Sequence, residues 1–210
     1  MSTAVKICGI TRGKDALSAA KLGANALGLM FYAASPRAIG IEQAQAICRA
    51  TPPFVTLVGV FVNPQRALVE SVARALPLNL LQFHGEEPPE FCAGFGVPYI
   101  KALRVRGGVD LLEYALAYSE ARGLLLDAFV PGRHGGSGQA FDWSLIPQDL
   151  PLPVILSGGL TAENVGEAIR RIRPWAVDVS SGVEAAPGLK DAQKMAAFVK
   201  GVRDADLRLA

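Results

Sequence analysis

Short runs of apolar residues recur along the whole chain, and stretches with a helical spacing of apolar residues separate them. Most runs carry Val, Ile, Leu or Phe at consecutive positions, which is typical of strands buried on both faces of a parallel sheet. The pattern predicts eight strands, at residues 5–8, 26–32, 55–62, 80–84, 99–105, 123–128, 154–157 and 176–180. Strands that alternate with helices indicate an α/β fold.

The helical stretches between these runs carry signals for their ends. The first stretch is expected to end at Gly23, since glycine is common just after a helix. The stretch that contains Pro64 is expected to hold this residue in its first turn. Thr161 is expected to cap the N-terminus of a later helix. The last helix is predicted to bury a face made of Leu189, Ala192, Ala196 and Val199.

Eight strand–helix units in 210 residues leave about 26 residues per unit, which is close to the compact limit for this repeat. Eight units close a barrel, so we expect a single (β/α)8 TIM barrel with eight parallel strands that spans residues 1–210 as one domain. An open doubly wound sheet is the alternative. It usually has fewer strands and a glycine-rich loop after the first one, and "CGIT" is not such a loop.

Composition narrows the class of protein. The 21 basic and 19 acidic residues give a formal charge of +2, which offers no footprint for nucleic acid or an anionic membrane. The apolar runs are too short to cross a bilayer, and the start of the chain lacks a signal-peptide pattern. Three widely spaced cysteines, Cys8, Cys48 and Cys92, fit neither a disulfide framework nor a zinc site. We therefore expect a cytoplasmic protein with free thiols.

Cys8 ends the first predicted strand, where a TIM barrel places its working groups. A free cysteine is more often a small buried apolar residue, and we interpret Cys48 and Cys92 in that way. Lys6 lies two residues before Cys8, so both side chains point to one face of the strand. A buried ammonium needs a negative partner or a substrate anion, and it favours a nearby thiolate. The pair suggests an activated thiolate that acts as a base or a nucleophile.

Other predicted strand ends add polar groups. Asp127 follows three leucines in "LLLDAF", so we expect a carboxyl group shielded from water, as suits a general acid, although a surface acid is the simpler interpretation. "LQFHG" places Gln82 and His84 on one face, and His84 could equally be a hydrogen-bonded core residue. Arg37, in "ASPRAIG", could clamp a carboxylate or simply be solvated.

Glycine-rich segments follow the seventh and eighth predicted strands. "ILSGGL" contains Gly158 and Gly159, and "DVSSGVE" contains Ser180, Ser181 and Gly182. Glycines let backbone N–H groups approach an anion, and the loops after these two strands often bind phosphate in TIM barrels. Either segment alone could be an ordinary turn, but both together favour a phosphate site. A third glycine-rich segment, "GRHGGSGQAFDW", has the length and composition of a mobile lid.

With these motifs in place, the chain resembles the phosphoribosylanthranilate isomerase family of tryptophan biosynthesis. The resemblance covers nearly the whole chain and is carried by "KICGIT", "FYAASPR", "VGVFVN", "LQFHG", "LLLDAF", "GGSGQAFDW", "ILSGGL", "DVSSGVE" and "PGLKD". The family more often has leucine where this chain has Phe83. By strand alternation Phe83 faces the helices, so we expect only local repacking there.

The resemblance implies an Amadori rearrangement of N-(5-phosphoribosyl)anthranilate, a small phosphorylated substrate. It implies that Cys8 is the general base and Asp127 the general acid. It assigns substrate contacts to Lys6, Arg37, His84 and Asp178, and phosphate contacts to Gly158, Gly159, Ser180, Ser181 and Gly182. Neither cofactor nor metal is implied, because the nitrogen of the substrate relays the electrons. The sequence leaves open a monomer or a homodimer.

Three alternatives remain. The sister sugar isomerase of histidine biosynthesis resembles this chain less, since an aspartate is expected there at the position of Cys8. A metal-dependent sugar-phosphate epimerase would have only His84 and His134 as histidine ligands, with no carboxylate at ligand spacing. A barrel that merely senses a phosphate ligand would need neither a poised thiol nor a buried acid.

Overall fold

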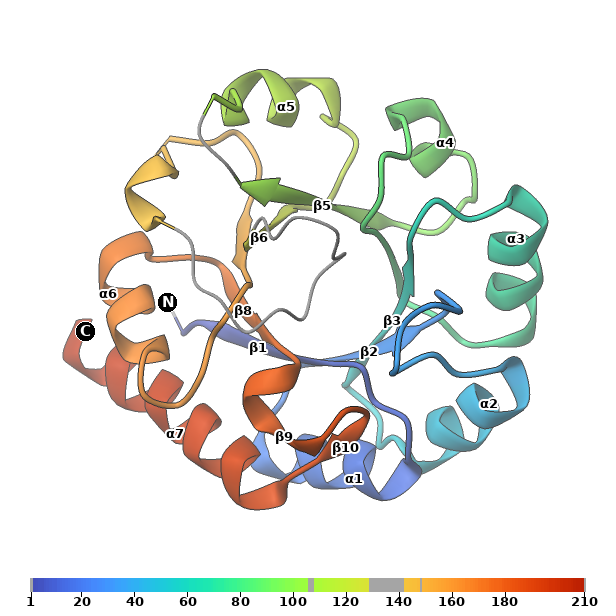
Figure 1. Cartoon of the computed structure of the whole chain (residues 1–210), viewed down its shortest axis with the longest axis horizontal. Helices are drawn as coiled ribbons and strands as arrows, with labels where there is room; N and C mark the ends of the chain where they lie inside the picture. The colour runs from blue at the N-terminus through green and yellow to red at the C-terminus, as the bar shows by residue number, and fades with distance from the viewer. Residues whose placement is uncertain (1, 106–107, 129–141, 148, 210) are drawn as a thin grey trace.

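A closed barrel of eight parallel strands forms the centre of the computed structural model, which describes residues 2–105, 108–128, 142–147 and 149–209 (Figure 1). Each strand pairs with its neighbours in chain order, and β8 pairs with β1 to close the ring. The strands are β1 (Ala4–Cys8), β2 (Ala26–Met30), β3 (Thr56–Phe61), β4 (Leu80–Phe83), β5 (Tyr99–Val105), β6 (Leu124–Ala128), β7 (Val154–Leu156) and β8 (Ala176–Val179). The predicted (β/α)8 barrel is thus confirmed, and every strand lies within two residues of its expected bounds.

Helices surround the barrel on its outside (Figure 1). They are α1 (Gly13–Leu22), α2 (Ile41–Ala50), α3 (Arg66–Ala75), α4 (Pro89–Ala93), α5 (Leu111–Ala117), α6 (Val165–Ile172) and α7 (Ala192–Leu209). Between β6 and β7 the described residues form a short 3₁₀ helix, Trp143–Leu145, in place of an α-helix. The prolines at 147, 151 and 153 explain this difference, because proline cannot continue a helix interior.

A short hairpin lies between β8 and α7 and was not predicted. It consists of the 3₁₀ turn Ser181–Val183 followed by the antiparallel strands β9 (Glu184–Ala186) and β10 (Leu189–Lys190). Figure 1 shows this hairpin beside the ring, next to α1 and the start of α7. The hairpin brings the "PGLKD" segment back toward the end of β8.

Two predictions about helix starts were wrong, whereas one about a helix end is confirmed. Gly23 follows α1 with a φ of 103°, a left-handed conformation that glycine adopts without strain. Pro64 lies before the helix, because α3 starts at Arg66. Thr161 does not cap α6, which starts at Val165. The side chain of Asn164 accepts from the Thr161 N–H at 2.8 Å and donates to the Gly159 carbonyl, so a closed turn delays the helix.

The predicted buried face of the last helix was also largely wrong. Leu189 is 41% exposed in β10, and Ala192 is exposed at the start of α7. The residues that α7 buries are Met195, Phe198, Val199, Val202 and Ala205. The hairpin sets the start of α7 and thereby its phase against the barrel, so only Val199 of the predicted set belongs to the fully buried face.

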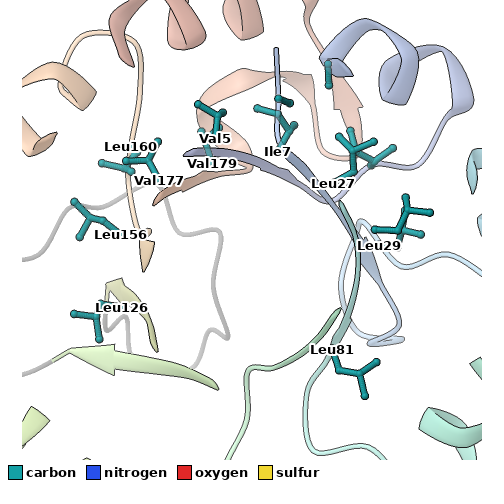
Figure 2. Close-up of a cluster of buried hydrophobic side chains, with 14 of the residues drawn as sticks. Val5, Ile7, Leu27, Leu29, Leu81, Leu126, Leu156, Leu160, Val177 and Val179 are labelled. Carbon is teal, nitrogen blue, oxygen red and sulfur yellow. The ribbon is translucent and has the colours of Figure 1, made fainter. Parts of the chain in front are cut away.

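The main hydrophobic core lies between the strands and the helices. Figure 2 shows part of it, with side chains such as Val5, Ile7, Leu27 and Leu29 on the outer side of the ring. Phe83 also faces outward, as predicted, and its ring lies 5.8 Å from that of Phe91 in α4. Because these positions alternate with inward ones, the intervening residues of the same strands fill the barrel.

Inside the barrel, an apolar layer supports a polar upper end. The layer contains Ile100, Ala102, Leu125, Ile155 and Ala176. Two strand positions further along, the inward side chains become polar, at the carboxyl ends of the strands where TIM barrels carry their active sites. No helix within the described part of the chain is both long and apolar enough to span a membrane.

Candidate active site

Cys8 is the last residue of β1 and points into the barrel. It is 6% exposed and pairs in register with Gly28 of β2. A Cβ atom at position 28 would lie only 2.6 Å from the Cys8 Sγ atom, so a glycine at this position makes room for the thiol. Gly28 was not identified from the sequence, where it is one of several glycines within an apolar run. The Cys8 thiol therefore occupies a space at the carboxyl end of the barrel that Gly28 leaves open.

Lys6 lies two residues before Cys8 on β1, on the same inward face of the strand. Its partner is Asp178 of β8. The Lys6 Nζ atom is 2.8 Å from the Asp178 Oδ1 atom, and both side chains are buried. Ser157, at the end of β7, donates to the other oxygen of Asp178 at 3.2 Å. Burial alone would lower the pKa of Lys6, but Asp178 and Cys8 raise it above its ordinary value. Lys6 therefore stays charged beside the thiol.

The surroundings of Cys8 disfavour its thiolate form at rest, a point that the sequence left open. Burial raises the pKa of the Cys8 thiol above its ordinary value, and the Asp178 carboxylate adds to this effect. Lys6 and Lys190 act in the opposite direction without reversing it. The sequence showed the ammonium of Lys6, but it could not show the distant carboxylate that neutralises it. Cys8 is thus predominantly a thiol near neutral pH.

Asp127 lies at the end of β6, inside the barrel and 3% exposed. Its Oδ2 atom is 3.1 Å from the His84 Nε2 atom, and its Oδ1 atom accepts the N–H of Ala128. The Gln82 Nε2 atom lies 3.0 Å from the His84 Nδ1 atom. When the amide nitrogen donates to Nδ1, the neutral imidazole carries its proton on Nε2 and donates it to Asp127. Gln82, His84 and Asp127 therefore form a buried chain, of which the sequence predicted only that Gln82 and His84 share one face.

The two glycine-rich segments after β7 and β8 lie against each other. Gly158 and Gly159 have φ values of 84° and 65°, a left-handed conformation that glycine permits. Their backbone N–H groups donate to no residue within the described ranges. A Cβ atom at Gly182 would overlap the Leu160 carbonyl oxygen, so this glycine lets the two segments touch. Unpaired N–H groups on adjoining turns make a favourable place for an anion.

Arg37 does not lie free in its loop. Its Nε and Nη2 atoms donate to the two oxygens of Glu184, each at 2.8 Å. Lys190 lies on the other side of Glu184, with its Nζ atom 2.8 Å from Oε1, and also donates to the carbonyl oxygen of Ser180 at 3.0 Å. Burial lowers the pKa of Lys190, although Glu184 opposes this change. The Arg37 guanidinium is therefore not simply solvated, and part of it is already bound to Glu184.

Most of the predicted site residues thus converge at one end of the barrel. Cys8, Lys6 and Asp178 form one group, His84 and Asp127 a second, and the glycine segments a third. Sequence reasoning missed Glu184 and Lys190, although both lie in the quoted motifs "DVSSGVE" and "PGLKD". The available signal was a charged residue inside each of two motifs that carry the family resemblance.

Two expectations concern residues without a described placement. His134 and most of the predicted lid, residues 132–141, lie outside the described part of the chain. Among the described residues, no group of three or more His, Cys, Asp or Glu side chains is arranged to hold a metal ion.

The other two cysteines lie in helices. Cys48 is half-buried in α2, and Cys92 is buried in α4 with its pKa raised by burial to about 12.

Comparison with known proteins places the chain in a family. Residues 5–201 match the family model described as N-(5'phosphoribosyl)anthranilate (PRA) isomerase. A protein of that name from Nitrosospira multiformis is 59% identical over 202 residues, which cover 96% of this chain and 97% of that protein. The crystal structure of phosphoribosyl anthranilate isomerase from Thermotoga maritima is 46% identical, with a TM-score of 0.89 over 96% of this chain and 99% of that one.

A second crystal structure from this group is of phosphoribosyl anthranilate isomerase in complex with reduced 1-(o-carboxyphenylamino)-1-deoxyribulose 5-phosphate. It is 45% identical to this chain, with a TM-score of 0.86, and the alignment covers 96% of this chain and 99% of that one. The sequence match and the shared barrel agree over nearly the whole length. The chain belongs to the N-(5'-phosphoribosyl)anthranilate isomerase family.

Proposed function

We propose that this protein is an isomerase of tryptophan biosynthesis that converts N-(5-phosphoribosyl)anthranilate to 1-(2-carboxyphenylamino)-1-deoxyribulose 5-phosphate. One observation carries the proposal: a buried thiol, Cys8, and a buried carboxyl group, Asp127, share the barrel end with two touching glycine segments. Membership of the family and the product analogue bound in a 45% identical relative support the same reaction. Residues 1–210 act in this proposal as one catalytic domain.

The reaction begins at the sugar ring. Asp127, once protonated, donates its proton to the furanose ring oxygen, and the bond between that oxygen and C1 breaks. The lone pair of the substrate nitrogen forms a C1=N double bond, which leaves a protonated Schiff base. General acid catalysis of this kind typically contributes 10²- to 10⁴-fold, an order-of-magnitude range. His84, whose Nε2 atom is 3.1 Å from Asp127, holds the carboxyl group in place.

The second step moves a proton from carbon. The Cys8 thiolate removes the proton from C2, and the electrons of that bond form a C1=C2 double bond while the C1=N electrons return to nitrogen. The resulting enol becomes the ketone when its hydroxyl loses a proton and C1 gains one. Lys6 favours the thiolate, whereas burial and Asp178 disfavour it. The reactive form of Cys8 is therefore a minor species near neutral pH.

The ends of the substrate are bound by separate groups. The N–H groups of Gly158 and Gly159, together with Ser180, Ser181 and Gly182, take the phosphate. The guanidinium of Arg37 uses two of its N–H groups on Glu184, so the remaining ones take the carboxylate of the anthranilate ring. The Lys6–Asp178 pair lies deeper in the barrel than Cys8 and binds the sugar hydroxyls.

Turnover of N-(5-phosphoribosyl)anthranilate, followed by the loss of its fluorescence, tests the proposed function. The assay is run on the purified full-length chain with and without exhaustive chelation of divalent metal ions. We expect turnover that is unchanged by chelation. The proposal would be overturned by an absence of turnover, by activity only on the aminoaldose substrate of histidine biosynthesis, or by activity that requires an added divalent ion.

A further inference from the structure

A network of three charged side chains connects the loop after β2 to the turn after β8. Glu184 is at its centre. The Oε1 atom accepts hydrogen bonds from the Arg37 Nε atom at 2.8 Å, the Lys190 Nζ atom at 2.8 Å and the Gly188 N–H at 3.2 Å. The Oε2 atom accepts from the Arg37 Nη2 atom at 2.8 Å. Lys190 completes its contacts on Ser180, through the carbonyl oxygen and the hydroxyl group.

The burial of this network is unusual for charged groups. The side chain of Lys190 is 0% exposed, that of Glu184 is 5% exposed and that of Arg37 is 11% exposed. Removing such charges from water is costly, and a buried ion pair is weak evidence for a contribution to stability alone. The hydrogen bonds of Glu184 fix the direction of the Arg37 guanidinium, because the contact is bidentate. The clearer effect of the network is therefore to hold the Arg37 guanidinium in one orientation.

Both ends of the network lie beside Cys8. The residue after Cys8 is Gly9, with a φ of 72°. A Cβ atom there would lie 3.2 Å from the Ser180 Oγ atom and equally close to the Arg37 Cγ atom. Arg37 and Ser180 thus pack over the same turn that presents the thiol. Under the proposed function, one of them binds the carboxylate of the substrate and the other its phosphate.

We propose that Glu184 is a positioning residue that ties the Arg37 guanidinium, through Lys190, to the Ser180 turn. The inference rests on the proposed function. The tie holds the sites for the two anionic ends of the substrate at a fixed separation across Cys8. A ligand with both ends then benefits from the tie, whereas a ligand with only the phosphate does not. The carboxylate oxygens of Glu184 already accept from Arg37, Lys190 and Gly188, so Glu184 acts on binding through Arg37.

A double-mutant cycle tests this role. Four proteins are compared, the unmodified chain, Glu184→Gln, Arg37→Met and the combination of both, with Asp204→Asn in an exposed pair of α7 as the matched control. The measurements are kcat and KM for N-(5-phosphoribosyl)anthranilate and the inhibition constant of ribose 5-phosphate, which carries only the phosphate end. Non-additivity in such a cycle isolates the coupling of two residues.

We expect Glu184→Gln to raise KM by about tenfold, since a hydrogen bond to a charged group has this order of effect. Its kcat should change by less than about threefold, and the inhibition constant of ribose 5-phosphate by less than about twofold. In the Arg37→Met background, Glu184→Gln should add almost nothing. Asp204→Asn should match the unmodified chain. If Glu184→Gln does not fold, Glu184→Asp carries the test and should raise KM with kcat preserved.

The contrary outcomes are distinct. A KM for Glu184→Gln equal to that of the unmodified chain overturns the positioning role. So does an effect of equal size in the Arg37→Met background, because Glu184 would then act independently of Arg37. Equal losses in kcat, KM and ribose 5-phosphate binding indicate a general structural role and also overturn it. An unmodified chain that does not turn over the substrate overturns the proposed function first.

Discussion

Lys101→Met is expected to destabilise the fold through a buried ion pair near the site. Lys101, in β5, is fully buried, and its Nζ atom donates to Glu87 at 2.7 Å and to the Gly85 carbonyl oxygen at 2.6 Å. The Glu87 carboxylate also accepts the backbone N–H groups of Asn63 and Gly85. Methionine preserves most of the aliphatic volume but leaves the buried carboxylate without its cation.

The structure sets the size of the effect. At 2.7 Å and an effective dielectric constant of about 20, two unit charges attract by roughly 6 kcal/mol. The cost of desolvating both charges offsets much of this attraction. Removal of one partner from a buried pair typically costs about 3–5 kcal/mol. With a denaturant dependence of about 2–3 kcal/mol per molar urea, the unfolding midpoint should fall by roughly 1–2.5 M.

Urea unfolding followed by circular dichroism measures this change. The control is Asp204→Asn, which breaks an exposed pair with Lys200 and should cost less than about 1 kcal/mol. Lys101→Met combined with Glu87→Gln should recover part of the lost stability, because no unpaired charge remains. A Lys101→Met variant within about 1 kcal/mol of the unmodified chain would refute the reasoning. The turn that carries His84 is anchored by the same pair, so kcat should fall as well.

Three further results are expected. Gly182→Val should weaken substrate binding and destabilise both glycine segments, because its side chain would overlap the Leu160 carbonyl; enzyme kinetics and thermal unfolding test both effects. Alkylation of Cys8 by iodoacetamide, followed by mass spectrometry, should still accelerate above pH 9, since burial raises the pKa of this thiol. A plateau reached by pH 8 would contradict this. Cys48→Ala should leave kcat within about twofold, as a half-buried helix residue away from the strand ends.

The strands of the fold could be predicted closely from the sequence. A strand of a covered parallel barrel is apolar on both faces, and that local signal does not depend on distant residues. The start of α6 was harder to predict, because Asn164 closes a turn back to Thr161 before the helix begins. The phase of α7 depended on the hairpin β9–β10, which has only a few residues and no alternation to identify it.

The site residues also divide into those that could be predicted from the sequence and those that could not. Alternation along single strands correctly placed Lys6 with Cys8 and Gln82 with His84, because neighbouring residues on one strand have fixed directions. Partners from distant parts of the chain could not be predicted. Asp178 lies 172 residues after Lys6, and it adds to the effect of burial in raising the pKa of the Cys8 thiol. Glu184 lies 147 residues after Arg37 and occupies part of its guanidinium.

The assignment of Cys8 as base and Asp127 as acid is the central claim, and the turnover of two variants tests it most directly. Cys8→Ala and Asp127→Asn are assayed with saturating N-(5-phosphoribosyl)anthranilate, beside Cys48→Ala and the unmodified chain. Binding of the reduced product is measured to confirm that each site is intact. We predict that both variants lose about 10²- to 10⁴-fold in kcat while they still bind the reduced product. A variant of either residue that binds this ligand and turns over substrate at a near-native kcat would contradict the claim.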